Sequence, residues 1–278
     1  MTAFMNNMKT AMLMAVLTAL FVLVGGMLGK GFIIPFAVMA VAMNFGAFFF
    51  SDRIAIAAMR GQEVDPSSGG GLYAMVDELR QKAGLPMPRV YICPHQAPNA
   101  FATGRSPSHA AVAVTQGALQ LLNEQELRGV IGHELAHVKN RDTLTSTIAG
   151  TIAGLLASIA QWGFLLGAGN RENGNPLVAM VTLIVAAVGA AMIRSMISRS
   201  REFVADAEGA RIAGSPNGLI SALQKLETVS RRVPLHNPNP AANNMFIVEP
   251  LTGGRTLMSL FATHPPTEQR VEALRRLA

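Results

Sequence analysis

Two histidines and a glutamate in one short run of this chain could do metal chemistry. The run is His133-Glu134-Leu135-Ala136-His137, an H-E-x-x-H pattern. Residues four apart lie on one helical face, so the imidazoles of His133 and His137 can bind one Zn²⁺. Zinc lowers the pKa of a bound water from about 15.7 to about 7, and Glu134 could accept its proton during attack on a carbonyl. The spacing therefore predicts a catalytic zinc site with Glu134 as the general base.

A third zinc ligand must come from elsewhere, because catalytic zinc sites use three protein ligands and one open position. The metzincin pattern has a further histidine after the second one, but Thr143 stands at that position. Glu202 is the best candidate, and Asp206, one helical turn later, could accept a hydrogen bond from a ligand histidine. Spacing alone equally allows a solvated helix beside the membrane for this stretch.

Long apolar segments without charged residues flank the sequence runs that contain these residues. Of the 278 residues, 50% are hydrophobic and 14% are charged, against roughly 25% charged in soluble domains. Four windows contain no Asp, Glu, Lys or Arg: residues 11–29, 31–51, 143–170 and 173–193. Because about 20 apolar residues cross a bilayer, the windows predict four transmembrane helices. Whether the third and fourth fully span the bilayer stays open.

The soluble remainder forms one domain from two separated pieces. We expect transmembrane hairpins over 1–58 and 143–197, and a peptidase domain built from 59–142 and 198–278. Topology brings His137 and Glu202 together, since one precedes and the other follows the second hairpin. Lys and Arg gather on the side of the termini and the soluble pieces, which predicts that side to be cytoplasmic.

Local patterns predict the elements of the first soluble piece. Asn123 and Glu126 form a capping-box pattern at the start of the motif helix. Alternating or continuous apolar runs predict two short strands, and Gly-rich residues 65–71 predict a flexible linker. The two strands are expected at 89–93 and 110–115. Further helices are expected at 72–83, from Ser215-Pro216 onward and at 268–277.

Charge and cysteine content exclude other classes of protein. The net charge is +6, but with one Trp, two Tyr and no basic block there is no nucleic-acid surface. The single Cys93 excludes an intrachain disulfide and a cysteine zinc cluster, and it fits a reducing cytoplasm. A transporter or scaffold with a structural metal is disfavoured, because all four windows lack ionisable residues.

Four longer runs extend the motif and occur in a characteristic order. They are PNAFATGR (98–105), HELAHVKNRDTL (133–144), SRSREFVADAEGA (198–210) and THPPTEQRVEALR (263–275). With them the chain resembles the M48 family of membrane zinc metallopeptidases, most closely its bacterial HtpX heat-shock proteases. The resemblance implies a mostly α fold with four transmembrane helices and an α+β, zincin-like cytoplasmic metallopeptidase domain.

The resemblance also implies roles for individual residues. His133, His137 and Glu202 would bind one zinc, Glu134 would be the general base, and Asp206 would support a ligand. The run Asn99-Ala100-Phe101 would form an edge strand that pairs with an extended substrate, which is recognition by strand addition. His264 would steady the tetrahedral intermediate, or else be a structural residue before a Pro-Pro turn.

The function implied is a zinc endopeptidase of the bacterial cytoplasmic membrane that cleaves misfolded or damaged membrane proteins. Its partners would be polypeptide substrates and the lipid bilayer, with a homo-oligomer left open and nucleic acid excluded. Both termini and the active site would be cytoplasmic. The alternative is a processing peptidase of narrow specificity, like the relatives that trim prenylated proteins.

Overall fold

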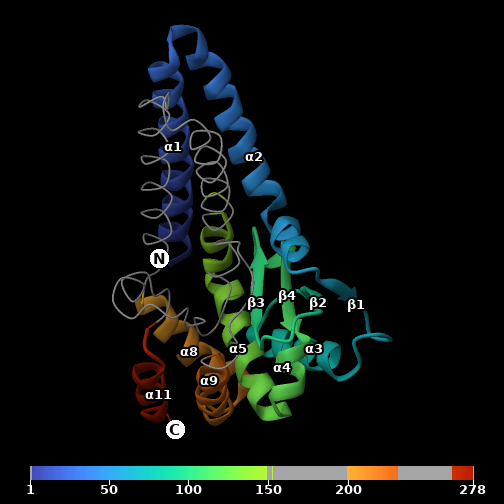
Figure 1. Cartoon of the computed structure of the whole chain (residues 1–278). Coiled ribbons are helices and arrows are strands. Elements are labelled where there is room, and N and C mark those ends of the chain that lie inside the picture. Colours follow the sequence, from blue (N-terminus) through green and yellow to red (C-terminus); the bar gives the residue numbers. More distant parts are fainter. Residues whose placement is uncertain (1, 149–151, 153–198, 231–264, 278) are drawn as a thin grey trace, which may run out of the picture.

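A computed structural model describes residues 2–148, 152, 199–230 and 265–277. A long helical hairpin rises from one end of a domain made of helices and a small sheet (Figure 1). The third and fourth apolar windows, apart from the first residues of the third, lie outside the described residues, as does His264.

The hairpin consists of α1 (Thr2–Leu28) and α2 (Ile33–Ala58), joined through the short 3-10 helix η1 (Lys30–Phe32). Both helices are long and apolar enough to cross a membrane, with a mean hydropathy of 2.0 over their spans. The exposed large hydrophobic side chains of the described residues all lie on this hairpin, except Val204 and Leu277. This surface suits lipid. Two candidate spans are thus seen where the sequence predicts the first two of four.

Polar side chains link the two helices inside this apolar hairpin. Asn44 of α2 donates from Nδ2 to the carbonyl of Met14 (3.0 Å) and to Thr18 Oγ1 (2.9 Å). Thr10 and Thr145 share a hydrogen bond of 3.0 Å between their hydroxyls. Leu144, Ile148 and Ile152 pack into the same hydrophobic cluster as α1 and α2. The chain that leaves the motif helix therefore enters the packing of the membrane hairpin.

The sheet has four strands in the order β1-β2-β4-β3. They are β1 (Gln62–Val64), β2 (Arg89–Cys93), β3 (Ala100–Gly104) and β4 (Ala110–Thr115). β2 and β4 are parallel, and the other two pairs are antiparallel. The strands predicted at 89–93 and 110–115 are confirmed. All six residues of β4 are buried, whereas β3 is an edge strand with one side unpaired by the described strands.

Six α-helices and the short 3-10 helix η2 (Pro107–His109) complete the described domain. The α-helices are α3 (Gly70–Ala83), α4 (Gln116–Leu121), α5 (Glu124–Asn140), α8 (Arg199–Ala213), α9 (Asn217–Ser230) and α11 (Thr267–Arg275). The capping box between Asn123 and Glu126 at the start of α5 is confirmed. The linker predicted before α3 is instead a hydrogen-bonded turn. Asp65 Oδ1 accepts the backbone N–H groups of Ser67 (2.9 Å) and Ser68 (2.8 Å), which orders the turn.

The motif helix α5 and α8 cross with their backbones in contact. A Cβ on Gly132 of α5 would lie 2.7 Å from the carbonyl oxygen of Gly209 of α8. A Cβ on Gly209 would lie 2.7 Å from the backbone N and Cα of His133. Real side chains do not tolerate such distances, so only glycine permits this approach. Because Glu202, Asp206 and Gly209 share one face of α8, the crossing brings the first two toward α5.

We expect Gly209→Ala to push α8 away from α5 and to lower the free energy of unfolding by about 1–3 kcal/mol. The melting temperature of the purified full chain in detergent, followed together with metal content, measures this effect. Gly71→Ala in α3 is the matched control, because a Cβ there meets nothing within 4 Å. Equal melting temperatures and metal contents for the two variants would contradict the role given to the crossing.

Candidate metal centre

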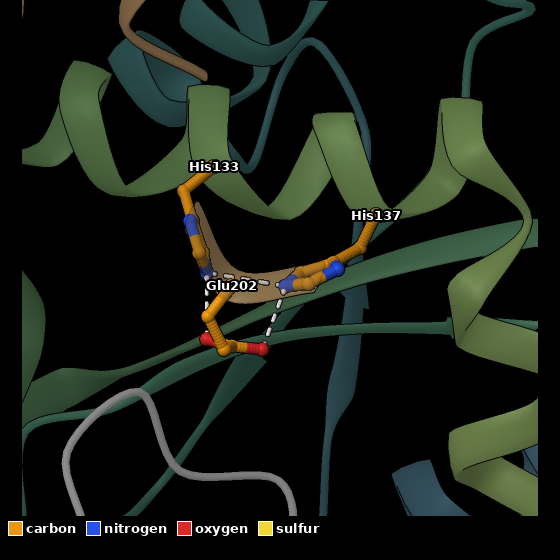
Figure 2. Close-up of side chains that lie close together, drawn as sticks. All are labelled: His133, His137 and Glu202. Atoms are coloured by element: carbon orange, nitrogen blue, oxygen red, sulfur yellow. Dashed lines mark hydrogen bonds and ion pairs between the residues drawn. The ribbon is translucent and has the colours of Figure 1, made fainter. Parts of the chain in front are cut away.

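Three side chains from two helices converge on one point. His133 and His137 extend from the same face of α5, and Glu202 reaches them from α8 (Figure 2). One donor atom from each lies within 4.8 Å of the others. The two Nε2 atoms are 3.2 Å apart, and Glu202 oxygens lie 3.7 Å from His133 Nε2 and 3.6 Å from His137 Nε2. The predicted ligand set is thus brought together.

The distances fit a tetrahedral zinc site. Bonds of about 2.0–2.1 Å from zinc to nitrogen or oxygen place neighbouring ligand atoms about 3.3 Å apart. Two imidazole nitrogens and one carboxylate, with a position left for water, are also the donor set of a hydrolytic zinc. Two neutral imidazoles that aim Nε2 lone pairs at the same point repel each other unless a cation or proton lies between them. The arrangement therefore fits a bound cation.

Carboxylates orient the far side of each ligand histidine. His133 Nδ1 lies 2.9 Å from Asp206 Oδ1, although its N–H is imperfectly aligned with that oxygen. His137 Nδ1 lies 3.3 Å from Asp142 Oδ2. Each pairing favours a proton on Nδ1 and so leaves Nε2 available for a metal. The contact between His133 and Asp206 is therefore mainly electrostatic.

Arg270 contacts the two carboxylates that α8 contributes to the site. It lies on α11 and is only 1% exposed. It donates two hydrogen bonds to Asp206, from Nη2 (2.6 Å) and from Nε (2.8 Å). Its Nη1 lies 3.8 Å from Glu202 Oε2. A buried guanidinium needs such pairing, because its desolvation is costly. The C-terminal helix therefore supplies the positive charge that balances the carboxylates of α8.

The site has a strongly negative electrostatic character. Burial disfavours a charged His137, but its hydrogen bond to Asp142 and the charges of Glu202 and Glu134 raise its pKa to about 9. Burial also opposes a charged Asp206, yet the charge and hydrogen bonds of Arg270, with His133, lower its pKa to about 2. The carboxylates that hold a proton on His137 favour a divalent cation at the same place.

Glu134 faces the edge strand β3. Its Oε2 accepts the backbone N–H of Ala102 at 2.8 Å, and its side chain is buried. This hydrogen bond fixes one carboxylate oxygen and leaves Oε1 for other chemistry. It also shows that the free edge of β3 points toward the motif helix.

The register of β3 decides which backbone groups remain available there. Thr115 of β4 donates its N–H to the carbonyl of Asn99 at 2.9 Å, and Phe101 pairs with Ala113. Because bonding alternates along an antiparallel pair, Asn99 and Phe101 face β4 while Ala100 and Ala102 face the free edge. The Phe101 side chain is buried with Ile56 and Met59. Of the three predicted residues, Ala100 is therefore the one whose backbone N–H and carbonyl face the free edge of β3.

Comparison with known proteins agrees with this geometry. The model of peptidase family M48 matches residues 66–278. The chain belongs to peptidase family M48. A "Protease HtpX homolog" of Desulforapulum autotrophicum is 49% identical, over 97% of this chain and 89% of the relative. Another, of Pelotomaculum thermopropionicum, is 46% identical over 99% of this chain and 100% of the relative.

A solved structure shares the fold. The crystal structure of S. mikatae Ste24p matches with a TM-score of 0.51 and 16% sequence identity, over 98% of this chain and 66% of that longer chain. With its M48 relatives and two candidate spans, the chain is a membrane metalloprotease. A metal at the group His133, His137 and Glu202 is what this family implies.

Sequence reasoning missed two residues of the site. Asp142 follows Arg141, the left-handed residue that ends α5 (φ 57°), and this reversal turns it back toward His137. Arg270 lies in the run 263–275, for which the sequence predicts a role only for His264. The position of Asp142, an acidic residue just after the end of the motif helix, could have indicated its contact with His137. No nearby residue in the sequence indicates that Arg270 pairs with Asp206. The role proposed for His264 stays a prediction.

We expect Asp206→Asn to weaken zinc binding about 10- to 100-fold, because the amide no longer orients His133 or balances Arg270. Competition with a chelator of known zinc affinity measures the change. Asp77→Asn on α3, a half-buried carboxylate that is not among the site residues, is the control for loss of one carboxylate. Zinc affinity unchanged in Asp206→Asn, with the protein still folded by its melting curve, would refute the supporting role.

Proposed function

We propose that this membrane metalloprotease is a zinc-dependent endopeptidase in which Glu134 is the general base. The convergence of His133, His137 and Glu202 beside Glu134 and the free edge of β3 is the observation that carries the proposal. Zinc is the favoured ion because two imidazoles and one carboxylate suit it better than they suit magnesium or calcium.

In the proposed reaction a bound zinc supplies Lewis-acid activation of water and of the peptide carbonyl. Glu134 takes a proton from the attacking water at Oε1, because Oε2 is held by the N–H of Ala102. The same oxygen then returns the proton to the nitrogen of the departing amine. Burial of Glu134 and Glu202 excludes bulk water and strengthens these charge interactions.

We propose that an extended substrate adds as a strand to β3. The N–H and carbonyl groups of Ala100 face the free edge and can pair with a peptide backbone next to the metal group. Backbone pairing is largely indifferent to side-chain identity, which supports action on many unfolded segments. It thereby supports a quality-control role against misfolded or damaged membrane proteins.

Position relative to the membrane supports the same role. The helical residues after α5 pack against α1 and α2, so the metal group lies a short distance from the proposed bilayer. We propose a bacterial inner-membrane location with both termini and the site on the cytoplasmic side, based on the distribution of Lys and Arg. The narrow processing peptidase would instead yield a few defined products from a membrane substrate.

We expect Glu134→Gln to reduce kcat on an unfolded protein substrate such as casein by about 10²–10⁴-fold. Zinc content should stay at one ion per chain, because Glu134 is not among the three ligands. Proteolysis in detergent, with bound zinc measured on the same preparation, tests both halves of this expectation.

Glu124→Gln is the matched control, since Glu124 lies in the first turn of the same helix and its side chain is 76% exposed. It should cleave casein at the wild-type rate. Full activity in Glu134→Gln would exclude Glu134 as the base, and activity that survives complete zinc removal would exclude the zinc mechanism.

A further inference from the structure

A cavity whose lining contains none of the metal-site residues lies where α2 meets the sheet. Its volume is about 470 Å³, within the range of about 300–1,000 Å³ typical of small-molecule sites. One wall is aromatic and comes from α2, and the other is polar and comes largely from the segments around β2, β3 and β4. The aromatic wall is Phe45, Phe49 and Phe50, and the basic residues are Arg53, Arg89 and Arg105.

The positive charge of this cavity is only partly compensated. Arg89 forms an ion pair of 2.6 Å with Asp52, the acidic side chain of the lining. Within the described part of the chain, no carboxylate lies at ion-pair distance from Arg53 or Arg105. Their guanidinium groups instead rest on phenylalanine rings, Arg53 at 5.8 Å from the Phe50 centroid and Arg105 at 5.5 Å from that of Phe49. Two cations thus remain available for an anion.

The donors around the cavity suit a phosphate group. Arginine binds phosphate oxygens with paired N–H groups, and the Ser108 hydroxyl and His109 imidazole line the same space. Both of these side chains are exposed and can turn toward a ligand. Asp52 is occupied by Arg89, so its charge does not oppose a second anion.

The depth of the cavity points to a lipid as the source of that phosphate. The candidate span of α2 starts at Lys30, and about 20 helical residues cover the hydrocarbon core of about 30 Å. The apolar region then ends near Ser51, so Phe45 lies at acyl-chain depth and Arg53 at headgroup depth. Phe45 is 57% exposed and Phe50 is 44% exposed, which leaves aromatic surface for an acyl chain beside the phosphate.

We propose that this cavity binds one anionic phospholipid, with its phosphate between Arg53 and Arg105 and an acyl chain along Phe45 and Phe49. Basic pockets beside transmembrane helices recognise anionic headgroups in this way. Arg105 directly follows Gly104, the last residue of β3, and the Gly104 carbonyl accepts a hydrogen bond from Thr143 at 3.1 Å. The bound lipid would therefore tie the membrane helix α2 to the strand that flanks Glu134.

Native mass spectrometry of the full chain, released from detergent with added phosphatidylglycerol or phosphatidylcholine, tests the proposal. We expect one phosphatidylglycerol to bind more tightly than phosphatidylcholine. Arg53→Gln and Arg105→Gln should each weaken phosphatidylglycerol binding roughly fivefold, and the double variant more. Arg53→Lys with Arg105→Lys keeps the charge and should retain most of the binding.

Arg60→Gln is the matched control, because Arg60 is an exposed cation just after α2 that does not line the cavity. It should leave phosphatidylglycerol binding unchanged. If Arg105→Gln does not fold, Arg53→Gln alone decides, since Arg53 is exposed. Equal binding of both lipids, an equal loss in Arg60→Gln, or full displacement of phosphatidylglycerol by millimolar inorganic phosphate would each overturn the proposal.

Discussion

The close crossing of α5 and α8 is the contact on which the site depends. Gly132 and Gly209 bring the two backbones together beside His133, and the distances from Glu202 to the two histidines follow from that approach. Glu202 lies two helical turns before Gly209 on the same face of α8, so a side chain at the crossing would move the third ligand away from the histidines. A carboxylate side chain is short, which leaves little room for compensation by a change of rotamer.

Charge balance is the second condition for this site. Glu134, Asp142, Glu202 and Asp206 surround two imidazoles in a buried space, and like charges at such distances raise the free energy of folding. The buried Arg270 offsets part of that repulsion, and a cation held by His133, His137 and Glu202 would offset more of it. Because Arg270 comes from α11, the last helix of the chain must dock before the α8 carboxylates are balanced. Metal site and tertiary fold therefore stabilise each other.

Two hydrophobic clusters connect the membrane hairpin to the peptidase domain. Residues just after α5 pack into the cluster of α1 and α2, and Phe101 of β3 is buried with Ile56 and Met59 at the end of α2. The chain that continues from the motif helix α5 and the strand β3 are thus both anchored to the hairpin. This arrangement gives α1 and α2 a part in positioning the site.

Local features of this protein were determined by the sequence itself. The H-E-x-x-H spacing places His133 and His137 on one helical face, and the capping box starts α5 at Glu124. Apolar runs define β2 and β4. Each of these features depends only on residues within one helical turn or one strand. Only the tertiary structure decided that Glu202 completes the group, that Asp142 and Arg270 support it, and that Ala100 and not Phe101 faces the free edge of β3. These outcomes depend on helix crossing, strand register and a contact across more than sixty residues between Arg270 and Asp206, and no local pattern of residues encodes such long-range geometry.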